Sequence, residues 1–120
     1  MIKVGYNDKR NVVIIEFIDK IDAAQAEQSY LDIQKIIPQC NKGFKILTDL
    51  SRVEFMDPKS VGMIKKSMDF FNSKGVTEIV RIIPDSGKDV GFNIMSLFHY
   101  SKNVKLITVE SREESEGFLS

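Results

Sequence analysis

The amino-acid sequence predicts a single α/β domain, a mainly parallel sheet with helices packed on it and an antiparallel N-terminal edge strand. The chain has 120 residues, which suits one hydrophobic core, because two smaller units would each bury little apolar surface. Short apolar stretches alternate with segments whose apolar residues recur at helical spacing, which predicts parallel strands joined by right-handed crossovers. A turn-rich cluster between the first two stretches predicts the antiparallel hairpin.

The first elements are a hairpin and a capped helix. Segments 3–9 and 11–19 are predicted strands, and the turn between them is rich in Asn and Asp. Asp22 followed three residues later by Gln25 predicts an N-cap with a capping box. A helix is therefore predicted over 22–37, with one apolar stripe.

A central strand and a second helix follow. Pro38 ends the first helix, and segment 44–50 is predicted to be a central strand that leads into a loop over 50–60. Asp57 is expected to cap the second helix, with Pro58 in its first turn, where a missing N–H costs nothing. The residues predicted to face the sheet from this helix are Val61, Ile64, Met68 and Phe71.

The remaining elements repeat the same alternation. Segment 76–84 is β-branched and lies between Gly75 and Pro84, so it is predicted to be a buried strand. A third helix is predicted over 88–101, a last strand over 104–111 and a short terminal helix after it. No repeat or linker divides the chain, so residues 1–120 are predicted to be one domain.

Composition limits the classes of function. Lysine plus arginine and aspartate plus glutamate each number 17, so no overall field attracts nucleic acid or an anionic membrane. The first residues lack the apolar core of a signal peptide, and no apolar run is long enough to span a bilayer. Cys40 is the only cysteine, which excludes an internal disulfide and fits a reducing compartment. The sequence therefore predicts a cytoplasmic protein.

The stretch DLSRVEFMDPKSVGM, residues 49–63, carries a resemblance to a known family. An apolar strand ending in Asp-Leu-Ser, an apolar pair around Phe and an Asp before a Gly-containing helix start resemble the STAS domain. This family includes anti-sigma factor antagonists and sulfate transporter tails, so the resemblance implies a signalling module. The positions that match the pattern are Asp49, Leu50, Ser51, Val53, Phe55, Asp57, Val61 and Gly62.

The same stretch departs from the family where its switch lies. In the antagonists, the serine two residues after the aspartate is phosphorylated, and here that position is Lys59, preceded by Pro58. Lysine has no hydroxyl for that chemistry. Ser60 is the nearest hydroxyl, but it is rotated by about 100° around the helix, so a kinase shaped for the family serine would approach it in the wrong direction. The phosphoserine switch is therefore predicted to be absent.

Other chemistry finds little support in the sequence. Asp49 at a strand end resembles a receiver phosphoacceptor, but the acidic pair that would hold Mg²⁺ is missing. His99 is the only histidine, and no nucleophile elbow is present. Cys40 follows Pro38 in a loop and has no histidine near it in the sequence, and a reactive thiol would need a cationic or helix-end setting. We therefore predict no enzyme activity, no metal and no cofactor.

The leading prediction is a non-enzymatic STAS-like regulatory module that acts in transcriptional signalling by protein–protein interaction. Its partner would be a kinase-like or sigma-pathway protein, or a second copy of the chain. The residues predicted to bind the partner are Asp57, Lys59, Ser60, Met63, Lys66 and Phe70, with Met63 and Phe70 as apolar anchors opposite the sheet-facing stripe.

The alternative prediction is a carrier of a small ligand or lipid head group. Its pocket would lie under the third helix, which is apolar around most of its circumference, including Phe92 and Met95. The loop between a strand and that helix is placed where α/β sheets bind ligands. The residues of this possible ligand loop are Asp85, Ser86, Gly87 and Lys88.

Overall fold

The computed structural model describes residues 1–83 and 104–119, which form a compact α/β domain around one five-stranded mixed sheet. The strands follow one another across the sheet in chain order, and β1 is antiparallel to β2 while all other neighbours are parallel. The strands are β1 (Ile2–Asn7), β2 (Val12–Ile21), β3 (Lys45–Met56), β4 (Glu78–Ile82) and β5 (Lys105–Val109). The predicted fold class, with its antiparallel edge strand, is confirmed.

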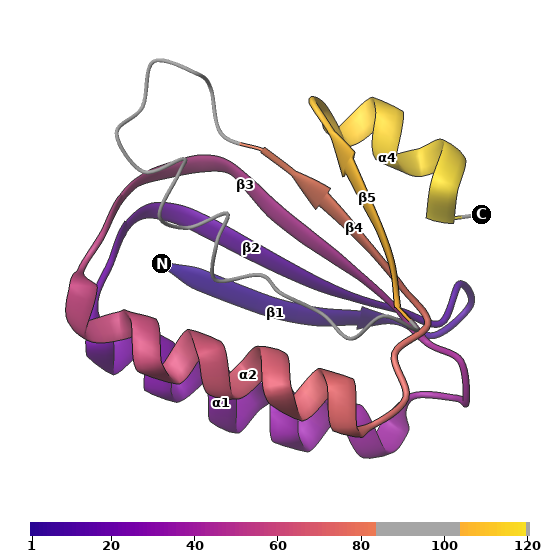
Figure 1. Cartoon of the computed structure of the whole chain (residues 1–120), viewed down its shortest axis with the longest axis horizontal. Helices are drawn as coiled ribbons and strands as arrows, with labels where there is room; N and C mark the ends of the chain where they lie inside the picture. Colours follow the sequence, from indigo (N-terminus) through magenta and orange to yellow (C-terminus); the bar gives the residue numbers. More distant parts are fainter. Residues whose placement is uncertain (84–103, 120) are drawn as a thin grey trace.

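Among residues 1–83 and 104–119, α-helices cover both faces of the sheet, as Figure 1 shows. The helices α1 (Ala23–Ile36) and α2 (Val61–Ser73) lie side by side on one face, and α4 (Arg112–Leu119) lies on the other. Short 3₁₀ turns follow α1 (Ile37–Gln39) and precede α2 (Pro58–Ser60). The predicted third helix and the ligand loop at 85–88 lie outside the described residues. Within the described part, no helix is long and apolar enough to cross a membrane.

Local sequence signals explain where the elements begin and end. The capping box predicted at Asp22 is present: its carboxylate accepts a hydrogen bond from the Gln25 backbone N–H at 2.8 Å, and the Gln25 side chain accepts one from the Asp22 N–H at 3.2 Å. Gly75, with a φ of 87°, follows α2 in a left-handed conformation that glycine adopts at little cost. These termini fix the entry and exit of the helices over the sheet.

The sheet is apolar on both faces because the strand side chains alternate between two clusters. Val13, Ile15 and Ile46 belong to the larger cluster, which α1 and α2 cover through residues such as Ile33 and Phe71. The members of the smaller cluster on the opposite face are Val12, Leu47, Val80, Ile82, Val109 and Leu119. Since Leu119 comes from α4, the C-terminal helix closes this second cluster.

The predicted loop over 50–60 is wrong for most of its length, because β3 continues to Met56. The second half of β3 pairs with the end of β2. The register between these two strands shifts twice, between Glu16 and Ile18 and between Asp19 and Lys20 of β2. Buried Val53 and Met56 account for the extension, since pairing this segment with β2 places both apolar side chains in the larger cluster. The connection to α2 is therefore only one tight turn.

Candidate functional site

The turn between β3 and α2 is built around Asp57. Its backbone N–H donates to the Ile21 carbonyl at 2.8 Å, which joins the turn to the end of β2. Its carboxylate accepts from the Lys59 N–H at 2.9 Å, and Pro58 occupies the first position after the cap. Asp57 therefore caps the 3₁₀ turn that leads into α2 and holds the backbone of Lys59 in place, whereas the N-cap residue of α2 itself is Ser60, whose side chain makes no capping bond.

Ser60 is buried under this turn. Its relative exposure is 0%, and its hydroxyl donates to the Asp57 carbonyl at 2.6 Å. A fully buried hydroxyl offers no surface to a partner or a kinase, so the structure removes Ser60 from the predicted contact surface. The sequence placed it in the first turn without showing which way the side chain points.

The other predicted contact residues divide into two groups. Lys59 and Lys66 are exposed and Asp57 is half-buried, so Asp57 and Lys59 reach the surface in the turn before α2 and Lys66 reaches it in the middle of α2. Met63 is half-buried and packs partly against the larger hydrophobic cluster. Phe70 lies one turn beyond Lys66, and its ring contacts α1.

Phe70 is not the exposed anchor that the helical wheel predicted. The ring is half-buried against the larger cluster and meets Tyr30 of α1 edge-to-face, with ring centroids 6.1 Å apart. The helical wheel considered only the sheet as a neighbour of α2. In the structure, α1 also lies beside α2 and covers the flank that carries Phe70 (Figure 1). Phe70 therefore belongs to the contact between the two helices.

Sequence reasoning missed Phe55 as a surface residue. Its side chain is 51% exposed at the end of β3, two residues before Asp57, and its partner across the ladder is Lys20 of β2. Buried Val53 and exposed Glu54 precede it, so strict alternation along the strand would have pointed Phe55 inward. Only the shifted register turns the ring outward.

Asp49 lies on the opposite face of the sheet, in a cluster with Glu16, Ser51 and Arg112. Its carboxylate accepts from the Ser51 N–H at 3.0 Å and the Ser51 hydroxyl at 2.6 Å, and Arg112 Nη1 donates to it at 3.2 Å. Glu16 is its partner across the ladder, and its carboxylate lies 3.9 Å from the same nitrogen. Both oxygens of the Asp49 carboxylate thus accept hydrogen bonds from structural donors. A phosphoacceptor would instead present a carboxylate oxygen that is free to react.

The geometry of the described residues gives little support to metal binding or to a reactive thiol. Within residues 1–83 and 104–119, no three His, Cys, Asp or Glu side chains gather as metal ligands. Burial raises the pKa of the Cys40 thiol, which disfavours the reactive thiolate at neutral pH. The candidate site is therefore the surface formed by Phe55, Asp57, Lys59, Met63 and Lys66, named here the β3–α2 surface.

Comparison with known proteins shows similarity at the level of structure. No family model and no curated protein matches the sequence. Among solved structures, the chain is similar to phosphorylated SpoIIAA of Bacillus, a cell fate determinant, with a TM-score of 0.67, 19% identity and full coverage of both chains. The unphosphorylated form, named an anti-sigma factor antagonist, gives a TM-score of 0.67 and 18% identity over 98% of this chain and 96% of that one.

Two further structures share the fold. A STAS domain protein from Planctomyces limnophilus gives a TM-score of 0.63 with 16% identity, covering 99% of this chain and 97% of that one. A protein from Shewanella loihica with a SpoIIAA-like fold gives 0.73 with 10% identity, covering 99% and 93%. The resemblance predicted from residues 49–63 is confirmed in structure: the chain has the fold of the STAS domain and of SpoIIAA-like anti-sigma factor antagonists.

Proposed function

We propose that this chain is a non-enzymatic regulatory module that docks a protein partner through the β3–α2 surface. The observation that carries the proposal is Phe55, a large aromatic side chain exposed among charged residues beside the tight turn at Asp57. Exposed aromatics flanked by polar residues are typical anchors of protein interfaces. The fold shared with anti-sigma factor antagonists supports a partner of the kind such proteins oppose, an anti-sigma-factor-like protein.

The charges of the surface suggest how the partner is oriented. Lys59 lies in the turn before α2, Lys66 lies in the middle of α2, and Lys20 is paired with Phe55 across the sheet ladder. These positive charges favour a partner patch that is acidic around an apolar pocket. Asp57 contributes through the turn geometry, since its carboxylate is already bonded to the Lys59 backbone.

Partner capture tests the proposal. Phe55→Glu should abolish capture of the partner from source-cell extract, and Kd of the purified pair should rise about thirtyfold or more, because removing an interface anchor costs at least about 2 kcal/mol. Leu31→Glu is the matched control, since Leu31 is similarly exposed, at 45%, in the middle of α1. Quantitative mass spectrometry and isothermal titration measure the two effects. Equal capture by Phe55→Glu and the parent would contradict the β3–α2 surface as the docking site.

Regulation of this surface by phosphoserine is not part of the proposal. Incubated with ATP and a serine kinase that modifies antagonists of this fold, the protein should gain essentially no phosphate within residues 57–60. Lys59 carries no hydroxyl, and Ser60 donates its own to a backbone carbonyl from a buried position. Intact-mass and peptide mass spectrometry give the readout, with an anti-sigma factor antagonist as positive control. Stoichiometric phospho-Ser60 would show that the turn opens and that a switch exists.

The carrier alternative has no separate support in the described structure. Its predicted loop, residues 85–88, and the third helix lie outside the described residues.

A further inference from the structure

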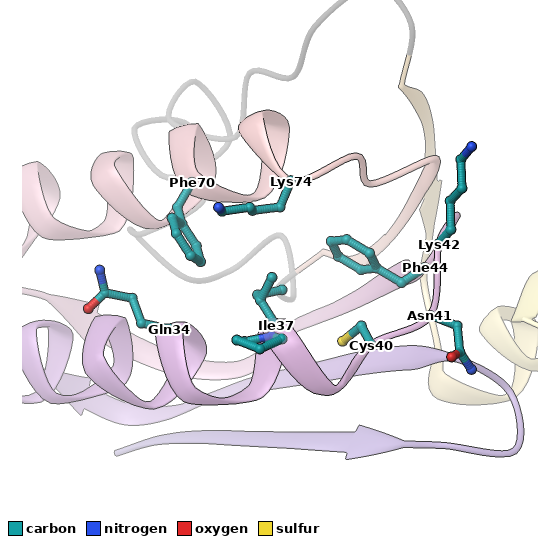
Figure 2. Close-up of a pocket in the computed structure, with 9 residues that line it drawn as sticks. Gln34, Ile37, Cys40, Asn41, Lys42, Phe44, Phe70 and Lys74 are labelled. Carbon is teal, nitrogen blue, oxygen red and sulfur yellow. The ribbon is translucent and has the colours of Figure 1, made fainter.

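The outer edge of β1 is an unpaired row of backbone groups. β1 comes first in the order of the sheet, so β2 is its only described neighbour, and Figure 2 shows β1 at the rim of the sheet below α1. The Met1 nitrogen donates to the Ile18 carbonyl at 2.6 Å, and the Ile18 N–H donates to the Met1 carbonyl at 2.8 Å. Because hydrogen-bonded and non-hydrogen-bonded pairs alternate along an antiparallel ladder, Ile2, Val4 and Tyr6 point their N–H and C=O groups away from β2. Among the described residues these groups have no hydrogen-bond partner, so the edge can accept a further strand.

The side chains at this edge favour such pairing. Ile2, Val4 and Tyr6 lie on the face that α1 covers, where they are half-buried and pack against the larger hydrophobic cluster. Each of them leaves part of its apolar surface exposed beside the free backbone groups. On the other face of β1, exposed Lys3 is the only charged side chain of the strand. A strand that pairs here therefore covers an apolar row and has to accommodate one positive charge.

Gly5 is not explained by the packing of a single copy. It lies in the middle of β1, a Cβ at its position would meet no atom within 4 Å, and its φ is not positive. Glycine in a strand interior weakens the strand, and it often marks a position that another chain or a ligand approaches closely. No neighbour in the described part of the domain requires the missing side chain.

We propose that β1 pairs with β1 of a second copy of this chain, antiparallel about a two-fold axis at Val4. In this register Val4 meets Val4, and each Ile2 meets Tyr6 of the other copy, so every outward-pointing residue of the strand is hydrogen-bonded. Lys3 then faces Gly5 of the second copy in a non-hydrogen-bonded pair, in which the Cα atoms lie about 4.5 Å apart. The stem of each lysine can lie across the glycine because no Cβ is in the way.

β1 is complementary to itself in this register and not in the neighbouring ones. A shift by two residues in one direction brings the two Lys3 side chains face to face, which like charges disfavour. The same shift in the other direction places Ile2 opposite Asp8, outside the strand. The pairing edge lies two strands away from β3, so the inference does not rest on the proposed function and leaves the β3–α2 surface free.

Charge variants at Gly5 test the pairing by sedimentation equilibrium, because the space at its Cβ allows both variants to fold. The parent should form a dimer with Kd below about 1 mM, the weak end of specific association. G5E places a carboxylate opposite each Lys3, so Kd should fall about two- to thirty-fold, and G5K should raise Kd by a similar factor. G117E and G117K are the matched controls, since Gly117 of α4 also has open space at its Cβ, and both should keep the parent's Kd. Thermal unfolding verifies that all variants are folded.

Disulfide trapping tests the register. K3C and G5C are prepared with Cys40→Ser, which removes the only native thiol, at the end of α1 in Figure 2. When the two proteins are mixed and oxidised, the disulfide between K3C and G5C should exceed the half expected from random pairing. The facing positions lie about 4.5 Å apart, whereas like positions lie about 7–8 Å apart, beyond the usual reach of a disulfide.

Three results would each overturn the proposal. They are a parent that stays monomeric to millimolar concentration, equal Kd values for G5E and G5K, and a mixed disulfide no more abundant than random pairing gives. A monomeric parent whose capture of a protein partner is lost in G5K would likewise reject self-pairing, and it would assign the edge to a strand of that partner.

Discussion

Replacing Phe71 with alanine is expected to lower the free energy of unfolding by about 3–5 kcal/mol, the usual cost of removing a buried aromatic ring from a packed core. Phe71 is 0% exposed in the larger hydrophobic cluster, and its ring lies 6.5 Å, centroid to centroid, from that of Phe44. A domain stability of about 5–15 kcal/mol would lose a large share through this one change. Urea denaturation followed by circular dichroism measures it.

Phe70 is the matched control one residue away on the same helix. Its half-buried ring contacts Tyr30 and Lys74 at the flank of α2, so Phe70→Ala should cost only about 1–2 kcal/mol. The difference between the variants separates the sheet-facing stripe from the contact between helices. Equal losses would show that the ring of Phe70 is as much a part of the core as that of Phe71.

Local signals in the sequence predicted most of the fold. The box at Asp22 and Gln25 specifies where α1 begins, and the β-branched segment around Ile79 forms β4 between the predicted turns. These predictions succeed because capping and periodicity depend on neighbours within one turn of helix or two residues of strand. The fold class follows from their order.

The candidate site was less predictable because it depends on contacts across the fold. The outward direction of Phe55 depends on a register shift between β2 and β3, which no local pattern reveals. Partial burial of Phe70 requires α1 at its side, and α1 also contacts the turn in which Ser60 is buried. A helical wheel gives the angle of a side chain about one helix, but it does not show which neighbour covers that angle.

Arg112 illustrates the same limit at a larger separation. It approaches Asp49 from 63 positions along the chain and joins α4 to the middle of the sheet. The Asp49 side chain is only 9% exposed, and the carboxylate of Glu16, its partner across the ladder, lies beside it. Arg112 therefore forms ion pairs with two neighbouring carboxylates on the face that α4 covers.

Arg112→Ala is expected to destabilise the domain by about 1–3 kcal/mol, because it leaves the Asp49 carboxylate with only its Ser51 donors. The cost should fall below the range for a fully buried pair, since the Arg112 side chain is 43% exposed and water screens its charge.

Arg10→Ala is the matched control: Arg10 pairs with Glu116 of α4 at a shorter 2.7 Å, but Glu116 is 54% exposed, so the loss should be at most about 1 kcal/mol. Chemical denaturation of both variants, of Asp49→Asn, and of Arg112→Ala combined with Asp49→Asn, measures the coupling between Arg112 and Asp49. Once Asp49 is uncharged, removal of Arg112 should cost less than it does in the parent. A loss for Arg112→Ala no larger than for Arg10→Ala would mean that the pair between Arg112 and Asp49 adds no more stability than the exposed pair between Arg10 and Glu116.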